Sequence, residues 1–189
     1  MSAPPPADRL FNFIGADIGN WRVIRVAPVV GETLPAVPCL SMVGGTLSAP
    51  PQGWHLRGIT SNERYVTRPE KTELVARQEG LGRTGSTHAA LIPIRKSAAW
   101  WAMTQDERRD VLEAQSQHIR IGLRYLPAIA RRLHHCRDLG TSEPFDFLTW
   151  FEYSAQDLAA FEELVAALRA SPEWNYVERE VDVRMVREV

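Results

Sequence analysis

Val177-Glu-Arg-Glu-Val-Asp-Val-Arg-Met185 is the stretch of sequence with the clearest structural pattern. Apolar residues share one parity, at Val177, Val181, Val183 and Met185. Charged residues share the other parity, at Glu178, Glu180, Asp182, Arg184 and Glu188. Successive side chains of a β-strand point to opposite faces, so this alternation predicts a half-buried strand, with one face in the core and the other in solvent.

Two further strands are predicted upstream of this one. Residues 88–95 form a short apolar run, with Pro93 near its end or on a sheet edge, because proline cannot donate to a central ladder. Residues 145–153 are aromatic and β-branched, which also favours a strand. All three predicted strands belong to the C-terminal half of the chain.

Helices are predicted between these strands. Thr104 and Glu107 have the spacing of a capping box, which indicates a helix from there to about His118. A second helix is predicted over Tyr125–Leu133, with Pro127 in its first turn. A third starts at Ser154 and Asp157 and is ended by Ser171-Pro172. The resulting order favours an α+β fold: an antiparallel sheet with helices on one face, in the ferredoxin-like arrangement.

The N-terminal half has weaker signals. Leu10–Ile14 and Trp21–Val30 are predicted strands, and a strand is plausible within His55–Thr67. Pro35–Pro51 is predicted to be a long loop with at most one short strand, because it holds several prolines and a Gly-Gly pair. Residues 1–8, which are rich in proline, are predicted to form a flexible tail.

Composition excludes several classes of protein. The 22 Lys and Arg against 23 Asp and Glu give a net charge of −1, which argues against a general nucleic-acid binder. No apolar run is long enough to span a bilayer, and the proline-rich N-terminus does not look like a secretory signal. Cys39 and Cys136 are too few for a disulfide framework. We therefore expect a soluble cytoplasmic protein without nucleic-acid or membrane partners.

Two motifs have misleading spacing. Gly80-Leu-Gly-Arg-Thr-Gly85 matches the dinucleotide pattern G-x-G-x-x-G, but a strand follows it instead of the helix that would hold a pyrophosphate, so a flexible loop is favoured. His134-His135-Cys136 resembles a metal cluster, yet adjacent residues do not readily converge on one ion. A structural role is favoured for the two histidines, with Cys136 as a buried free thiol.

Other residues are ambiguous when taken singly. His118 fits either a surface helix or a ligand. Trp100-Trp101 could pack in the core or form a wall for a flat aromatic ligand, with Lys96 available for a carboxylate. Arg131-Arg132 could be solvated, or one arginine could clamp an anion in a pocket. Glu173 by itself is unremarkable.

Together these residues resemble the chlorite dismutase family. The resemblance is carried by Lys96-Ser-Ala-Ala-Trp100-Trp101, by His118, and by the run from Gly122 to Cys136; it continues through residues 145–152 and Pro172-Glu173-Trp174. It covers roughly residues 60–189, and the chain looks like the compact, homodimeric form. The resemblance implies a dimeric α+β barrel of two ferredoxin-like halves: residues 9–87, truncated, and residues 88–189, which bind haem.

The resemblance also implies haem b and a set of site residues. His118 would be the proximal iron ligand, and Glu173 would accept its other ring proton. Arg131 would be the distal arginine, with Arg132 the alternative if the register shifts by one. The remaining expected contacts of the cofactor are Lys96, Trp100, Trp101, Tyr65, Asn62, the apolar distal residue Leu126, and Gln78, which would hydrogen-bond the arginine.

The implied reaction converts the small anion chlorite to chloride and dioxygen through a ferryl and hypochlorite intermediate. Two alternatives stay open. A coproheme decarboxylase shares the fold and the proximal histidine, but the coproheme decarboxylases generally lack the distal arginine. The presence of Arg131 therefore favours a chlorite dismutase. A non-catalytic haem-binding dimer is the other alternative, and retention of the proximal pair together with Arg131 argues against it.

Overall fold

A closed antiparallel barrel forms the centre of the computed structural model, which describes residues 7–62 and 64–187. Within these residues its strands are β1 (Leu10–Ala16), β2 (Trp21–Val30), β3 (Cys39–Gly44), β4 (Trp54–Thr60), β5 (His88–Lys96), β6 (Ala130–His135), β7 (Phe147–Tyr153) and β8 (Val177–Val186). Their order around the barrel is β1-β3-β2-β8-β5-β7-β6-β4, and the pairings between them are antiparallel. The α+β class and the antiparallel sheet are therefore confirmed.

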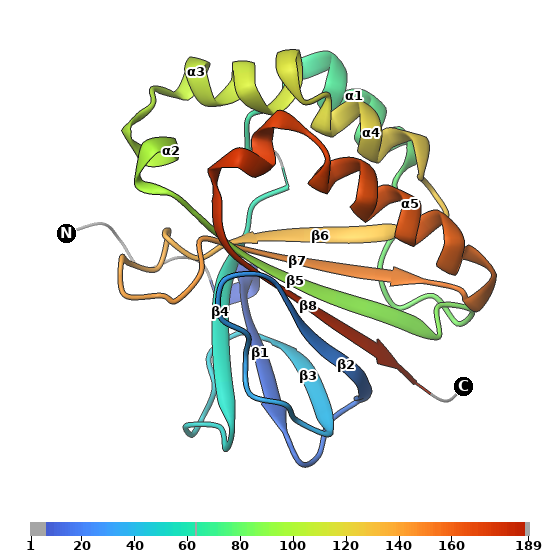
Figure 1. The fold of residues 1–189 in the computed structure, drawn as a ribbon. Coiled ribbons are helices and arrows are strands. Elements are labelled where there is room, and N and C mark those ends of the chain that lie inside the picture. The colour runs from blue at the N-terminus through green and yellow to red at the C-terminus, as the bar shows by residue number, and fades with distance from the viewer. Residues whose placement is uncertain (1–6, 63, 188–189) are drawn as a thin grey trace.

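Helices lie on one side of this barrel, over β5, β6, β7 and β8 (Figure 1). In chain order the helical elements are η1 (Ala7–Arg9), α1 (Arg68–Arg77), α2 (Ala98–Ala102), α3 (Gln105–Arg109), η2 (Asp110–Gln115), α4 (His118–Arg124), η3 (Ala155–Asp157), α5 (Leu158–Arg169) and η4 (Pro172–Tyr176). Residues 10–60 and 88–186 each contribute four strands, and the β2–β8 and β4–β6 pairs join the two groups. None of the described helices is long and apolar enough to cross a membrane.

Three apolar clusters form among the described residues, and two of them lie against the sheet. One fills the barrel interior, where Phe13, Leu91, Trp150 and Val183 are essentially inaccessible to solvent. The other lies between the outer face of β5 and β7 and helix α5, and it includes Ile92 and Phe161. Strands such as β5 are consequently buried on both faces, which explains why residues 88–95 form a continuous apolar run instead of an alternating one.

The expectation of a half-buried β8 is wrong. Val181, Val183 and Met185 do face the barrel interior, but the charged face lies buried beneath α5, with Glu180 and Asp182 both 0% exposed. Cations reach both carboxylates there. Arg169 of α5 lies 2.7 Å from Glu180 and 2.9 Å from Asp182. The charged residues at alternate positions of β8 therefore form buried ion pairs and do not face solvent.

Arg184 extends this network and holds it to α5. Its guanidinium pairs with Asp182 on its own strand and with Glu162 of α5 at 2.6 Å. Burial raises the pKa of Asp182, but hydrogen bonds and charge from Arg184 and Arg169 outweigh it and leave that pKa below its usual value. The pairing explains how a strand with charges at alternate positions can pack under a helix.

Two helix predictions need correction. The helix that follows the capping box of Thr104 and Glu107 does not reach His118: the box is present, but α3 passes into the π-helical turn η2, and His118 begins α4. Residues 125–133 are not a helix, because α4 ends at Arg124 and Ala130 begins β6. Pro127 marks the end of a helix here, since proline disfavours helical geometry at the residue before it.

Other elements follow the sequence more closely. The strands over Leu10–Ile14 and Trp21–Val30, and the single short strand within Pro35–Pro51, are confirmed. Pro93 is neither at an edge nor at an end: it lies inside the central strand β5, where the pairing with β8 is interrupted between Leu91 and Ile94. Of the expected tail over residues 1–8, residues 1–6 lie outside the described residues.

Candidate active site

A cavity of about 410 Å³ lies between the sheet and the helices. Its floor is the outer face of β5, β6 and β7, and α1, α4 and α5 form the other walls. The apolar side chains that line it are Val66, Leu74, Val75, Ile92, Ile94, Trp100, Leu112, Ile119, Leu133, Phe147, Phe151, Val165, Leu168 and Trp174. A mostly apolar space of this size with a few polar groups is typical of a cofactor or ligand site.

His118 is the first residue of α4, and a break in the helical structure between η2 and α4 brings it to the cavity. Gln117 has a positive φ of 52°, which turns the chain between η2 and α4. The carboxylate of Glu113 then accepts a hydrogen bond of 2.7 Å from the Ile119 N–H, so it caps the start of the new helix. Because of this break, the N-terminus of α4, with His118, lies at the cavity.

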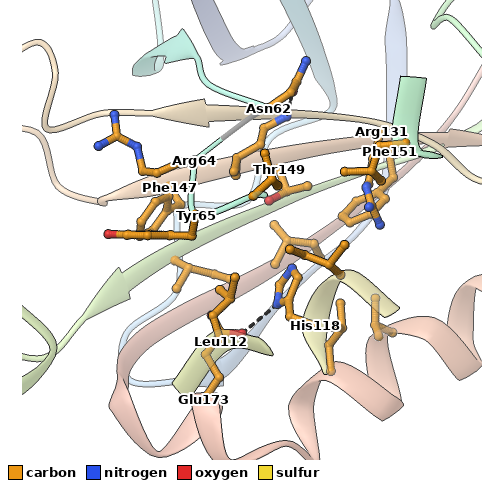
Figure 2. Close-up of a pocket in the computed structure, with 18 of the residues that line it drawn as sticks. Asn62, Arg64, Tyr65, Leu112, His118, Arg131, Phe147, Thr149, Phe151 and Glu173 are labelled. Carbon is orange, nitrogen blue, oxygen red and sulfur yellow. Dashed lines mark hydrogen bonds and ion pairs between the residues drawn. The ribbon is translucent and has the colours of Figure 1, made fainter. Parts of the chain in front are cut away.

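A buried carboxylate fixes the orientation of the His118 ring. Nδ1 of His118 lies 2.6 Å from Oε2 of Glu173 (Figure 2). Lys96 Nζ lies 2.8 Å from Oε1 of the same carboxylate. Burial raises the pKa of Glu173, but the neighbouring His118 and Lys96 more than reverse this and bring it to about 2. Glu173 is therefore an ionised acceptor at neutral pH, so Nδ1 of His118 carries a hydrogen and Nε2 is left as a potential metal ligand.

Arg131 enters the cavity from its floor, on β6, across from His118 (Figure 2). Burial lowers the pKa of this arginine to about 10, so it stays protonated at neutral pH. None of the described residues forms an ion pair with it. Its guanidinium lies against Gly122 of α4, where a Cβ would overlap it. An arginine without a carboxylate partner in an apolar cavity is a strong potential anion site.

The register of β6 decides between the two adjacent arginines. Because side chains alternate along a strand, Arg131 and Leu133 face the cavity, whereas Arg132 lies on the other face, with its guanidinium 4.6 Å from the ring centroid of Phe11. The structure therefore selects Arg131 as the cavity arginine.

Trp100, Tyr65 and Asn62 also line the cavity, as the sequence led us to expect. Trp100 is 1% exposed, and its indole Nε1 has no hydrogen-bond partner among the described residues. Asn62 accepts a hydrogen bond from the Leu133 N–H through its side-chain oxygen at 2.9 Å. An unpartnered buried N–H needs an acceptor, and a ligand carboxylate would supply one.

Gln78 lies at the cavity but binds Arg131 differently from the expectation. Its Nε2 donates to the backbone carbonyl of Arg131 at 2.8 Å, rather than hydrogen-bonding the guanidinium. This contact joins the end of α1 to β6. Gln78 therefore holds the strand that carries Arg131.

Trp101 and Leu126, two of the expected cofactor contacts, do not line the cavity. The Trp101 indole N–H donates to Asp146 at 3.1 Å, and its ring stacks on that of Phe147. Leu126 packs among Trp100 and other side chains of the helical layer. Adjacent residues of a helix point in different directions, and of these two tryptophans only Trp100 lines the cavity.

Several lining residues were missed by sequence reasoning, although a signal for them existed. Phe147, Thr149 and Phe151 occupy alternate positions of β7, and Ile92 and Ile94 do so on β5. Once these strands are known to be buried on both faces, the period of two identifies the cavity floor. The α1 wall was missed as well, although Thr67 and Glu70 form a capping box.

The two misleading motifs have structural roles. The glycine pattern at residues 80–85 is part of an irregular segment that is followed by β5. His134, His135 and Cys136 are buried, and both cysteines are free. Burial raises the pKa of the Cys136 thiol. Among the described residues, no group of three His, Cys, Asp or Glu side chains is placed to hold a metal ion.

Comparison with known proteins gives a consistent result. The family model described as chlorite dismutase matches residues 48–189. A chlorite dismutase from Ideonella dechloratans is 31% identical over 128 residues, which are 64% of this chain and 40% of that protein. The match thus spans less than half the length of that curated relative.

Solved structures extend the similarity. A structure described as a dimeric chlorite dismutase from Nitrobacter winogradskyi is 56% identical, with a TM-score of 0.86, and the match covers 94% of this chain and 99% of that one. A chlorite dismutase variant from Candidatus Nitrospira defluvii is 27% identical with a TM-score of 0.57, covering 78% of this chain and 56% of that one. With a family match over most of its length, the protein belongs to the chlorite dismutase family.

Proposed function

We propose that the protein is a haem b enzyme that converts chlorite to chloride and dioxygen. The observation that carries this proposal is the pair of opposed groups in the cavity: His118, held by Glu173 at 2.6 Å, and Arg131, which has no carboxylate partner among the described residues. One wall thus offers a nitrogen ligand and the other a positive charge. A small anion over a metal would satisfy both.

The residues present fit haem b. The cavity lining is mainly apolar, as a porphyrin ring requires, and Nε2 of His118 is free to bind its iron. The unpartnered indole N–H of Trp100 suits a propionate oxygen, and Asn62 and Tyr65 line the same cavity. When bound, haem b supplies a redox-active iron that can break the Cl–O bonds of chlorite.

The chain's own groups would divide the remaining work. Glu173 accepts the Nδ1 hydrogen of His118, which fixes the ring and makes Nε2 more basic. Lys96 keeps Glu173 ionised, so its ammonium supports the proximal side instead of reaching a propionate. Arg131 attracts chlorite and holds chlorine oxyanions in the cavity until the two oxygen atoms leave as dioxygen, which balances ClO2⁻ against Cl⁻ and O2.

We also propose the finer architecture and assembly. Residues 88–186 follow the order β-α-β-β-α-β with the strand order β8-β5-β7-β6, which supports a ferredoxin-like half; residues 9–87 would be its truncated counterpart. A homodimer is supported by the similar dimeric structure from Nitrobacter winogradskyi. A cytoplasmic location remains our proposal from composition alone.

One assay tests the function. The purified protein is loaded with haem b, chlorite is added, and oxygen is followed with an electrode. We expect rapid release of one O2 per chlorite, and no release from a His118→Ala variant given the same haem. Absence of oxygen from the parent protein, together with conversion of coproheme under peroxide, would support the decarboxylase alternative. Haem binding with neither activity would support the non-catalytic one.

A further inference from the structure

The irregular segment over residues 78–86, which contains the glycine pattern, is fastened to the barrel at several points. The N–H of Gly82 donates to the buried carboxylate of Glu152 at 2.6 Å, and Gln78 donates to the Arg131 carbonyl at 2.8 Å. The carbonyls of Arg83 and Ser86 accept hydrogen bonds of 3.0 Å from the guanidinium of Arg187. The segment therefore has a fixed position beside the cavity, although its glycine pattern suggests a flexible loop.

Arg83 joins this segment to the connection between α4 and β6. Its Nη1 donates to the Pro127 carbonyl at 3.0 Å and its Nη2 to the Ala128 carbonyl at 2.7 Å. Glu79, four residues earlier, lies 2.8 Å from Nη1 and orients the guanidinium. The planar fork of an arginine suits two neighbouring carbonyls, and a lysine could not bind both in this way.

The segment that Arg83 holds connects the two sides of the active site. Residues 125–129 lead from α4, which begins with His118, to β6, which carries Arg131. They form turns, and a single backbone hydrogen bond of 2.9 Å, from Ile129 N–H to the Tyr125 carbonyl, lies within them. The position of this connection determines where β6 begins relative to α4. It therefore also determines the position of Arg131 relative to His118.

We propose that Arg83 is a positioning residue for Arg131. By bonding the carbonyls of Pro127 and Ala128, it fixes the connection between α4 and β6 and thereby the distance of the Arg131 guanidinium from the proximal side. This role deepens the proposed function and rests on it. It also gives the glycine-rich segment a use: it carries Arg83 to the α4–β6 connection.

The first test does not depend on haem or activity. Hydrogen exchange of the purified protein is followed by mass spectrometry for Arg83→Ala and for the matched control Arg77→Ala. Arg77 also pairs with a glutamate four residues earlier, Glu73, at 2.9 Å, but it lies on α1. We expect amides in residues 125–133 to exchange at least about threefold faster in Arg83→Ala and to be unchanged in the control. Equal exchange in both variants would overturn the proposal.

The second test asks whether Arg83 acts through Arg131. Fluoride, a small anion, is titrated into the ferric haem-loaded protein and followed by the visible spectrum. We expect Arg83→Ala to weaken fluoride binding about three- to tenfold and the control to leave it unchanged. In an Arg131→Ala background the Arg83 substitution should have no further effect.

The outcomes separate this proposal from the proposed function. Additive losses in the double variant would show that Arg83 acts independently of Arg131 and would overturn the positioning role. Fluoride affinity that is retained in an Arg83→Lys variant would also contradict it, because two carbonyls need the guanidinium fork. A parent protein that binds haem and fluoride but releases no oxygen from chlorite would instead refute the proposed function and leave both tests of Arg83 valid.

Discussion

His134 should make the folded protein sensitive to acid. It lies on β6, three residues after Arg131, with 0% exposure, between the rings of Phe11 and Phe13 at centroid distances of 5.1 and 5.0 Å. Its Nδ1 faces the Leu148 carbonyl at 3.0 Å and so carries the hydrogen, whereas Nε2 is buried without a partner. Protonation at Nε2 would bury a charged N–H, and burial accordingly lowers the pKa of His134 to about 4.

The size of the effect follows from linkage between proton binding and folding. An unfolded histidine has a pKa of about 6.5, so above that pH both states are neutral and the full stability is present. As the pH falls from about 6.5 towards 4, only the unfolded state takes up the proton, and stability decreases by about 1.36 kcal/mol per pH unit. Between pH 7 and pH 5 this single group should remove about 2 kcal/mol from the free energy of unfolding.

A variant isolates this contribution from the other titrating groups. Urea unfolding is followed by tryptophan fluorescence from pH 4.5 to 7.5 for the parent protein and for His134→Phe, which retains a ring of similar size. His135, whose pKa burial also lowers to about 4, is present in both proteins and cancels. The parent should lose about 2 kcal/mol more than the variant between pH 7 and pH 5. Parallel stability curves would refute the reasoning, because His134 would then titrate alike in both states.

Three further substitutions test the site. Arg131→Ala should retain haem, seen in the Soret band, but inactivate after fewer turnovers; an unchanged number of turnovers per haem would contradict its role. Lys96→Met should destabilise the fold by about 3–5 kcal/mol in urea, because it removes the buried ammonium partner of Glu173; a loss below about 1 kcal/mol would contradict this. Trp100→Phe should destabilise the fold by about 1–3 kcal/mol in urea, because the smaller ring leaves a cavity at a buried position, and it should weaken haem binding about fivefold in titrations, since the unpartnered indole N–H is lost as well; equal haem affinity would argue against a propionate contact.

Local sequence signals predicted the elements whose cause is itself local. The capping box at Thr104 and Glu107 and the apolar parity of β8 both depend on neighbours within a few residues, and both are present. The solvent face of β8 was predicted wrongly because its partner, Arg169, lies on a different element, and an alternating strand looks the same whether α5 or water covers it. The strand at β6 was missed because pairing with β7 decides it.

The same distinction applies to the site. A resemblance in spacing pointed to His118, Glu173 and Arg131, but only the fold shows that His118 and Glu173, 55 residues apart in the chain, lie 2.6 Å apart. It also shows that Arg131, rather than Arg132, faces the cavity. The sequence could not show that Trp100 lines the cavity and Trp101 does not, because this depends on how the short helix α2 is rotated about its axis.

The pairing of charges around the cavity explains how a protein with a net charge of −1 can concentrate an anion. Three of the cations that line it are held by carboxylates: Lys96 by Glu173, Arg64 by Asp138 and Arg169 by Glu180. Their fields are largely cancelled at short range. Arg131 has no such partner among the described residues, and its apolar surroundings do little to screen it. The attraction for an anion is therefore concentrated at Arg131, across the cavity from His118.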